Sequence, residues 1–428
     1  MFALLDGNNF YASCERVFQP QLRHRPVVVL SNNDGCAIAR SDEAKALGVK
    51  MGQPIHQVPA AIRRQLVIRS ANFTLYGDLS ARINTILRAA VPRVESYSID
   101  ECFLDLDGIR DREALAWELR ARVERWTGIP NGIGIGSTKT LAKLANHVAK
   151  SAQRKPGSYP DAYAGVADLA SLSPAVLVDV LAATPVGEVW GVGRRWSDKL
   201  QAQGIHTALQ LRDAPRDQVL QHFGVTLART QRELAGLACM DLEEVEPDRQ
   251  QIMVSRSFGA RVYDHDAVRE ALVSFAVRAC EKLRQRNLVA SAAGIFASTD
   301  AFDREAIQHH PQRAANLPGA TSDSRLVAAN VAQLSRRFLK QGLAYKKAGV
   351  WLMDLARPAD LQPELFGPAT AGNERLMEVV DAINRRHGRG AIGLGATGWQ
   401  STPPWGMRQE HLSPRFTTAF SDLPVAYC

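Results

Sequence analysis

Short apolar runs separated by polar turns fill the N-terminal third of the chain and predict a layer of strands and helices. The run FALLD at 2–6 predicts a buried strand that ends on an acid, followed by the turn-prone Gly7-Asn8-Asn9 and a short helix from Phe10. Beyond it the pattern predicts a strand over 27–30, a helix over 42–47 that ends at Gly48, a helix over 75–90, strands over 93–99 and 102–106, a helix over 111–126, a Gly-rich strand over 132–136 and a helix over 139–150. This order is typical of an α+β fold with helices on one side of a sheet.

Polar and proline-bearing stretches divide the rest of the chain. A first boundary is expected at 153–160, and residues 172–238 after it have the pattern of an all-helical segment. The charged stretch EEVEPDRQQ at 243–251 predicts a linker. After the linker, the pattern predicts strands over 252–262 and 348–355, helices over 267–286 and 325–342, and a tether rich in Pro, Gly and Ala over 356–372.

Composition narrows the class of protein. The chain has 428 residues, 46% of them apolar, which is enough for several packed domains. Its apolar runs are far too short to span a bilayer, and its N-terminus lacks the basic and apolar regions of a signal peptide. Six scattered cysteines without a CxxC pair fit a reduced cytosol. The net charge of +8 suits a polyanionic partner, although charge alone does not identify one.

Three acids form the main candidate site. Asp100 and Glu101 lie between two strand-like segments, where a hairpin connection would let both side chains reach one side, and Asp6 ends the first strand. If these strands are neighbours, the carboxylates converge, and two unit charges about 4 Å apart repel by roughly 4 kcal/mol at an effective dielectric of 20. Such a site needs cations, and oxygen ligands favour Mg²⁺ over Zn²⁺. Two such ions would support phosphoryl transfer. The spacing leaves an alternative open, in which Asp100-Glu101 is a solvated turn and Asp6 caps a helix.

Four ordered motifs add a resemblance to a known family. They are DGNNFYASCE at 6–15, SNNDGCAIARSDEAKALGVKMG at 31–52, YSIDE at 97–101 and GIGIGSTKTLAKLANHVAK at 132–150. Together they resemble the Y-family DNA polymerases that synthesise DNA across lesions, and most closely the UmuC-type branch. The resemblance implies a right-hand fold with a palm of antiparallel sheet plus helices, fingers, a helical thumb with a helix–hairpin–helix and an α/β little finger. The expected ranges are 1–12 and 75–165 for the palm, 13–74 for the fingers, 166–240 for the thumb, 243–355 for the little finger, and 356–428 for a C-terminal tether and extension.

The resemblance also implies roles for single residues. Two Mg²⁺ ions are expected on Asp6, Asp100, Glu101 and the backbone carbonyl of Gly7. Tyr11 matches a steric gate, an aromatic side chain that lies where a ribose 2′-OH would sit and so favours dNTPs. The other expected nucleotide contacts are Phe10, Cys36, Ile38, Lys45 and Lys150. Asp42 occupies the position where relatives have a Tyr that helps to hold the triphosphate, so that contact is in doubt.

The DNA contacts are expected outside the palm. The stretch WGVGRRWSDKLQAQGI at 190–205 resembles a helix–hairpin–helix whose backbone N–H groups at Gly191 and Gly193 approach a phosphate beside Arg194 and Arg195. Two arginines of the segment 252–262, Arg256 and Arg261, lie an odd number of residues apart. On a regular strand, two such side chains point to opposite faces, so only one of them would face DNA unless a bulge at Gly259 changes the alternation. We take Arg256 to be the arginine that faces DNA.

The remaining expectations concern partners. Gln362, Leu365 and Phe366 in the tether resemble a peptide that binds the β sliding clamp. The resemblance implies primer-template DNA, a UmuD-type dimer and a RecA filament as partners, no membrane, and a cytoplasmic, nucleoid-associated location. Two rival functions are a catalytically dead scaffold that binds DNA and the clamp, and a nucleotidyl cyclase. The first is disfavoured because all three acids are present, and the second gives the thumb-like and tether segments no purpose.

Overall fold

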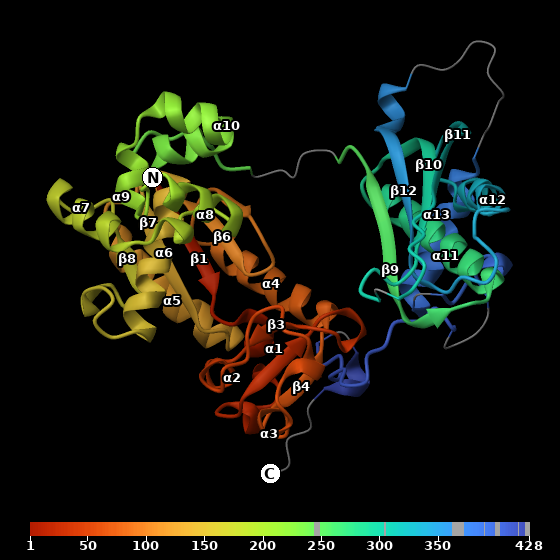
Figure 1. Cartoon of the computed structure of the whole chain (residues 1–428), viewed down its shortest axis with the longest axis horizontal. Helices are drawn as coiled ribbons and strands as arrows, with labels where there is room; N and C mark the ends of the chain where they lie inside the picture. Colours follow the sequence, from red (N-terminus) through yellow and green to blue (C-terminus); the bar gives the residue numbers. More distant parts are fainter. Residues whose placement is uncertain are drawn as a thin grey trace. The chain divides into compact units, whose positions relative to one another are not determined.

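The computed structural model describes residues 1–243, 249–303, 305–361, 372–388, 390–398, 403–417 and 419–423. Its described residues form two compact units. The first unit is built from residues within 1–31, 36–246 and 411–428, and the second from residues within 32–35 and 247–410. Figure 1 shows the helices and strands of both units.

The core of the first unit is a five-stranded sheet in the order β5-β6-β1-β7-β8. Its strands are β1 (Phe2–Gly7), β5 (Val94–Ser96), β6 (Glu101–Asp105), β7 (Asn131–Gly136) and β8 (Val166–Asp168). All neighbours are antiparallel except β8, which pairs in parallel with β7. The apolar residues of β1 are buried, as the sequence predicts, because both faces of the sheet are packed: Ala3 and Leu5 belong to the main apolar core of the unit, and Leu4 packs with Phe103 and Ala142. Residues 166–168 therefore belong to the palm sheet, just past the expected boundary at 165.

Helices cover this sheet. They are α1 (Phe10–Val17), α4 (Phe73–Arg88), α5 (Arg112–Thr127) and α6 (Lys139–Arg154). Each of α4, α5 and α6 begins on a side chain that accepts a hydrogen bond from the first turn: Asn72, Asp111 and Thr138. The backbones of α6 and β7 approach each other closely, because Gly134 and Gly136 have no Cβ between them.

The fingers segment adds a small sheet that the sequence pattern only partly predicts. Its strands β2 (Val27–Leu30), β3 (Ala37–Arg40) and β4 (Val67–Ser70) lie in the order β3-β2-β4, with the short helices α2 (Asp42–Ala46) and α3 (Ala60–Arg63). Only β2 is predicted, because all four of its residues are large apolar side chains, three of them the strand-favouring valine. β3 and β4 each contain arginine, so their strand character depends on pairing with β2.

The all-helical segment is confirmed. It consists of α7 (Pro174–Ala183), α8 (Arg194–Ala202), α9 (Ala208–Asp213) and α10 (Arg216–Leu234). Its apolar core is shared with α6, whose side chains Leu141, Leu144 and Val148 belong to the same cluster as Leu200 and Leu227. The predicted thumb thus packs directly on the helix that carries the lysines of the palm.

The second unit contains a four-stranded antiparallel sheet in the order β11-β10-β12-β9. Its elements are β9 (Ile252–Val262), α11 (His265–Gln285), β10 (Val289–Ser298), β11 (Gln312–Thr321), α12 (Ser324–Leu334) and β12 (Tyr345–Ala356). The helix predicted over 325–342 is shorter, ending at Leu334, and Arg337 beyond it has a positive φ of 50°. A register shift in the β9–β12 ladder falls between Ser257 and Val262, around Gly259.

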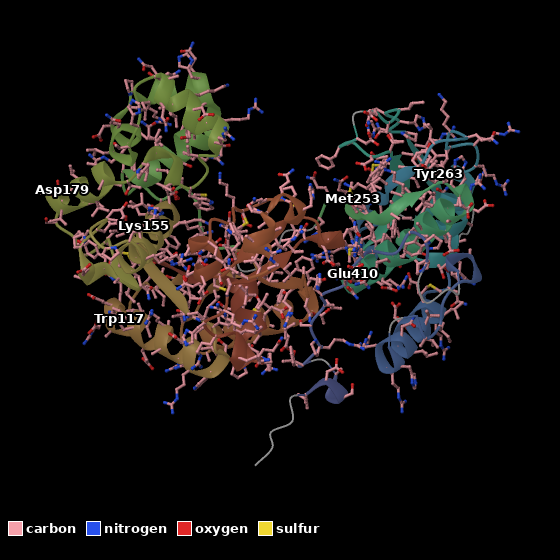
Figure 2. All side chains as sticks on the ribbon, turned by 60° about the horizontal axis from the view of Figure 1, so that its bottom comes forward. Trp117, Lys155, Asp179, Met253, Tyr263 and Glu410 are labelled. Carbon is pink, nitrogen blue, oxygen red and sulfur yellow. The ribbon has the colours of Figure 1, made fainter. Side chains whose placement is uncertain are left out.

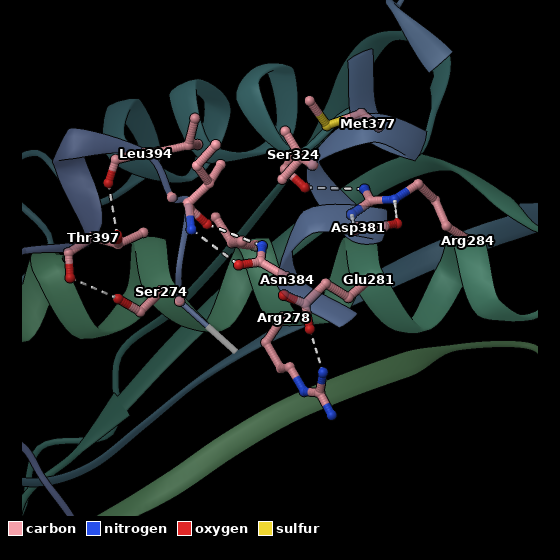
Figure 3. A pocket seen from close by; sticks show the side chains of 15 residues that line it. Ser274, Arg278, Glu281, Arg284, Ser324, Met377, Asp381, Asn384, Leu394 and Thr397 are labelled. Carbon is pink, nitrogen blue, oxygen red and sulfur yellow. Dashed lines mark hydrogen bonds and ion pairs between the residues drawn. The ribbon is translucent and has the colours of Figure 1, made fainter. Parts of the chain in front are cut away.

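Among the described residues that follow β12, the longest helix is α13 (Glu374–His387). The Arg284 guanidinium on α11 makes two hydrogen bonds to Asp381, with Nε–Oδ2 and Nη2–Oδ1 distances of 2.6 and 2.7 Å. A pocket of about 210 Å³ lies where α11 and α13 meet the segment 390–397 (Figure 3). The last described residues, 411–423, leave this unit and belong to the first.

No helix in the described part of the chain is long and apolar enough to cross a membrane. The five cysteines among the described residues are all free thiols.

Candidate active site

The strand register brings the backbone of the three acids together. Asp6 on β1 lies directly opposite Glu101 on β6, so their side chains leave the same face of the sheet. The Gly7 N–H donates to the Asp100 carbonyl oxygen at 2.9 Å. β5 and β6 pair antiparallel and Ser96 lies opposite Cys102, which confirms the predicted hairpin. Asp100 lies in the connection of this hairpin, whereas Glu101 is already the first residue of β6.

Each carboxylate has a partner of its own. Asp6 Oδ2 lies 2.5 Å from Lys150 Nζ, and both oxygens of Glu101 lie 2.9 Å from Lys143 Nζ. Asp100 accepts a hydrogen bond from the Ser98 hydroxyl at 2.6 Å. Across the described residues, no three His, Cys, Asp or Glu side chains are grouped closely enough to hold a metal ion. The predicted convergence is therefore present in the backbone, while lysines of α6 neutralise two of the three side chains.

The surroundings of Asp6 raise the pKa of its carboxyl group. Burial raises the pKa of Asp6 to about 6, and the negative charges of Glu101 and Asp100 act in the same direction. The Lys150 ammonium lowers this pKa and offsets part of the burial effect. A partly buried carboxylate near two others is an environment that favours a bound cation.

A pocket of about 300 Å³ opens beside these acids. It joins an acidic edge, formed by Asp6 and Asp100, to four basic side chains. The predicted residues that line it are Asp6, Gly7, Phe10, Tyr11, Ile38, Lys45, Asp100 and Lys150, and the others are Asn9, Ala39, Arg40, Met51 and Arg154. Glu101 and Cys36 are not among the lining residues. The Cys36 backbone N–H instead donates to the Ser31 hydroxyl at 3.1 Å.

The polar stripe of α6 faces the sheet. Lys143 and Lys150 reach the acids, and Asn146 donates to the Gly132 carbonyl oxygen at 2.8 Å. Lys139, one turn earlier, is buried and pairs with the buried Glu95. Both faces of α6 are therefore covered, because the thumb packs on its apolar side.

Two basic residues of the pocket were not predicted. Arg154 lies four residues after Lys150, on the same face of α6, and was missed because the helix was expected to end at 150. Arg40 ends β3 and donates to the Val49 carbonyl oxygen at 2.8 Å. Lys139, Lys143, Asn146 and Lys150 are spaced 4, 3 and 4 residues apart, and extending this spacing by one more turn would have found Arg154. Arg40, by contrast, is brought to the pocket by the pairing of β3 with β2.

Asp42 holds the basic side of this pocket in place. Lys45 Nζ donates to Asp42 at 3.0 Å and also to the side chain of Asn9, and Arg154 Nε lies 3.9 Å from the same carboxylate. Burial alone would raise the pKa of Asp42, but hydrogen bonds from Asn9 and Lys45 and the charge of Arg154 outweigh it and lower that pKa. The Asp42 carboxylate thus holds two basic side chains of the pocket, Lys45 and Arg154.

Tyr11 is fixed by aromatic neighbours. Its ring stacks on Tyr76 with a centroid distance of 4.6 Å and an interplanar angle of 18°, and Phe73 meets its edge at 5.8 Å. Burial raises the pKa of the Tyr11 hydroxyl, and the nearby Asp100 charge adds to this effect. One side of Tyr11 is thus packed against α4 while the residue lines the pocket.

The predicted DNA contacts fall in two places. Gly191 has a φ of 86°, a left-handed conformation that favours glycine, and α8 begins after Gly193 with no side-chain cap. Arg194 and Arg195 are exposed in the first turn of that helix. In the second unit, the strand register puts Arg256 on the same face as buried Val254, while Met253 points to the other face and is 46% exposed (Figure 2). A DNA contact by Arg256 stays a prediction.

The clamp-like residues Gln362, Leu365 and Phe366 lie outside the described residues.

Family models match most of the chain, and related proteins align over nearly its whole length. Residues 5–147 match the model of the impB/mucB/samB family, residues 249–365 match that family's C-terminal domain, and residues 374–426 match a domain of unknown function. The chain is 44% identical to protein UmuC of Salmonella typhimurium strain LT2, over 99% of both chains. It is 43% identical to protein ImpB of Salmonella typhimurium, over 100% of this chain and 99% of the relative.

The fold agrees with these relatives. A solved Y-family DNA polymerase chimera built on Dbh superposes with a TM-score of 0.63 at 20% sequence identity, covering 83% of this chain and 99% of the other. A likeness at that identity shows a shared fold. The chain belongs to the impB/mucB/samB family of Y-family DNA polymerases, and it is an error-prone DNA-directed DNA polymerase for translesion synthesis.

Proposed function

We propose that the pocket beside Asp6 and Asp100 takes the triphosphate of an incoming dNTP, and that two Mg²⁺ ions are held by the three acids and the Gly7 carbonyl. The observation that carries the proposal is the union of an acidic edge with four basic side chains in one pocket. When bound, the ions lower the pKa of an attacking primer hydroxyl and neutralise charge on the leaving phosphate. Y-family polymerases use divalent metal and bind primer-template DNA and dNTPs.

The residues fit such ions in their chemistry. The acids present only oxygen donors, which is the ligand type that Mg²⁺ prefers. Burial raises the pKa of Asp6, so a positive charge beside this carboxylate favours its ionised form, and Lys150 supplies one here. We expect Lys150 and Lys143 to turn from the acids toward phosphate when cations take their place. The side chains of Lys45, Arg40 and Arg154 supply the remaining positive charge for the triphosphate.

Tyr11 is proposed as the steric gate of this pocket. Replacing Tyr11 with Ala should raise the efficiency of rNTP insertion relative to dNTP insertion by at least about tenfold, because the stacked ring no longer fills the space of a 2′-OH. Single-nucleotide primer extension with dCTP and CTP opposite a template guanine measures the ratio. Leu237→Ala, at an exposed thumb position, is the control and should leave the ratio unchanged. An unchanged ratio in Tyr11→Ala would remove the gate assignment.

The start of α8 is proposed as a phosphate contact of the thumb. Arg194→Ala should weaken binding to primer-template of any sequence and reduce the slope of log affinity against log salt by about one. The matched control is Lys199→Ala, which removes the same charge from the last turn of the same helix and should change the slope little. Fluorescence anisotropy over a salt series gives both slopes. Equal slopes for the two variants would contradict a specific contact at the helix N-terminus.

The tether is proposed to bind the β sliding clamp through Gln362, Leu365 and Phe366. Replacing Leu365 and Phe366 together with Ala should abolish stimulation of primer extension by added clamp while leaving extension without clamp intact, because the apolar anchors are lost. Pro363→Ala in the same tether is the control. Stimulation that persists in the double variant would show that the motif is misread.

The same proposal extends to assembly and location. The similarity to UmuC supports a UmuD-type dimer as partner, and a RecA filament and a nucleoid-associated cytoplasmic location are expected with it. Primer extension past an abasic template site, with and without the UmuD-type dimer and RecA filament, tests the partners directly. Bypass that is equal in both reactions would show that the chain works alone.

A further inference from the structure

The buried carboxylate of Glu15, near Tyr11, connects the body of the first unit to residues close to the C-terminus. Glu15 lies one turn after Tyr11 on α1 and is 0% exposed. Its Oε1 accepts a hydrogen bond from the Tyr76 hydroxyl at 2.7 Å and a second from the Ser413 hydroxyl at 3.0 Å. Its Oε2 lies 3.7 Å from Arg69 Nε. Buried charges of this kind are costly unless donors satisfy them.

The segment 411–416 is held firmly where it meets this carboxylate. The Ser70 N–H donates to the His411 carbonyl oxygen, and the His411 N–H donates to the Ser70 hydroxyl, both at 3.0 Å. Asn72 donates to the Ser413 hydroxyl at 3.0 Å and to the Pro414 carbonyl oxygen at 3.2 Å. Figure 1 shows this blue segment beside the fingers sheet and α1.

An aromatic side chain also anchors the segment 411–416 in the first unit. Phe416 is 6% exposed and belongs to the main apolar core of the first unit. Its ring stacks on Phe18 with a centroid distance of 4.9 Å and an interplanar angle of 15°. The segment therefore forms part of the folded unit, although more than 300 residues separate it from its neighbours in the sequence.

A series of contacts leads from the segment 411–416 to the Tyr76 ring, on which Tyr11 stacks. Tyr76, which donates to Glu15, is the residue on which Tyr11 stacks. Asn72, which donates to Ser413, also accepts the Leu75 N–H at 3.3 Å and so caps α4, the helix that carries Phe73 and Tyr76. Ser413 of the segment 411–416 thus contacts both Glu15, which holds the Tyr76 hydroxyl, and Asn72, which caps the helix that carries Tyr76.

We propose that Ser413 is a positioning residue for Tyr11, and that the C-terminal segment 411–416 thereby sets the discrimination between dNTPs and rNTPs. Ser413 donates to Glu15 Oε1, the same oxygen holds the Tyr76 hydroxyl, and the Tyr76 ring holds Tyr11 against the pocket. Loss of the Ser413 hydroxyl leaves Glu15 with one fewer donor, so Tyr76 and the ring on it gain freedom. The inference rests on the proposed role of Tyr11 as the steric gate.

The test uses the full chain and two substrates. Ser413→Ala should raise the ratio of kcat/KM for CTP to that for dCTP by about fivefold, with kcat/KM for dCTP within about twofold of the unchanged protein. Ser413→Thr keeps a hydroxyl and should restore the original ratio. Ser421→Ala, which removes an exposed hydroxyl from the same tail, is the matched control and should leave the ratio unchanged.

A second variant tests the same proposal if the Ser413→Ala protein does not fold. Tyr76→Phe keeps the stacked ring and removes only its hydrogen bond to Glu15, so it should raise the same ratio. An unchanged ratio in these variants, or an equal loss of activity with both nucleotides, would overturn the positioning role. The Tyr11→Ala measurement separates the two failures: if Tyr11→Ala does not raise the ratio, the gate assignment itself is wrong, and if it does, only the role of the tail fails.

Discussion

Replacing Asp100 with Asn is expected to lower the rate of primer extension by at least about a hundredfold, a loss of roughly 3 kcal/mol of transition-state stabilisation. The amide keeps the shape of the side chain and can still accept a hydrogen bond from Ser98. It carries no negative charge, so the acidic edge of the pocket loses one of its two lining carboxylates. Single-turnover extension of a labelled primer with Mg²⁺ and dNTPs measures the effect.

The matched control for this experiment is Asp107→Asn. Asp107 follows β6 at the end away from the pocket, and its exposed carboxylate pairs with the N-terminal ammonium of Met1 at 2.6 Å. Its replacement should leave extension unchanged. Binding of primer-template should be retained by both variants, since the proposed thumb contacts are untouched. If the Asp100 variant extends primers as well as the control does, the acids are not the metal site.

Replacing Gly134 with Ala should destabilise the first unit by about 3 kcal/mol or more, because a side chain would push two backbones apart. A Cβ at Gly134 would lie 2.0 Å from the Asn146 backbone nitrogen and 2.4 Å from the Ala142 carbonyl oxygen. Neither atom can move without shifting α6, the helix that carries Lys143 and Lys150. A decrease of about 6–12 °C in Tm is expected, together with a loss of activity.

The same strand provides a control for the Gly134 experiment. A Cβ at Gly132 would have its nearest neighbour at 3.6 Å, an ordinary contact with the Lys150 side chain. Gly132→Ala should therefore change the Tm by no more than about 2 °C, which corresponds to less than about 1 kcal/mol. Thermal unfolding followed by circular dichroism compares the two variants directly. Similar unfolding temperatures would show that the close approach of β7 and α6 is not limiting for stability.

Local patterns predicted the elements on which the site is built. The apolar run before Asp6 and the paired strands around Asp100 and Glu101 are visible as strands because their burial requires continuous apolar side chains. The lysines of α6 share one face because their spacing follows the helical period. These features depend on residues close together in the chain, so the sequence pattern is sufficient to find them.

Other features of the site depend on pairings between distant segments. The strand that carries Arg40 is short and half of its residues are alanine, which does not favour strands, so its strand conformation depends on pairing with β2. The sequence leaves a phosphate contact at position 42 in doubt, and only the tertiary structure shows that Asp42 pairs with Lys45 of its own helix and with Arg154 of α6. Pairing of Lys150 with Asp6 likewise depends on α6 packing over the sheet.

The sequence by itself therefore determined the family, the acids and the lysine-bearing helix, because motifs and periodicity are local properties of the chain. Only the tertiary structure decided which charges meet, and that the end of the chain returns to the catalytic unit. Ser413 has no distinguishing pattern in the sequence, and its partner Glu15 lies 398 residues away. Contacts over such a separation arise from the packing of whole elements, which no local pattern of residues encodes.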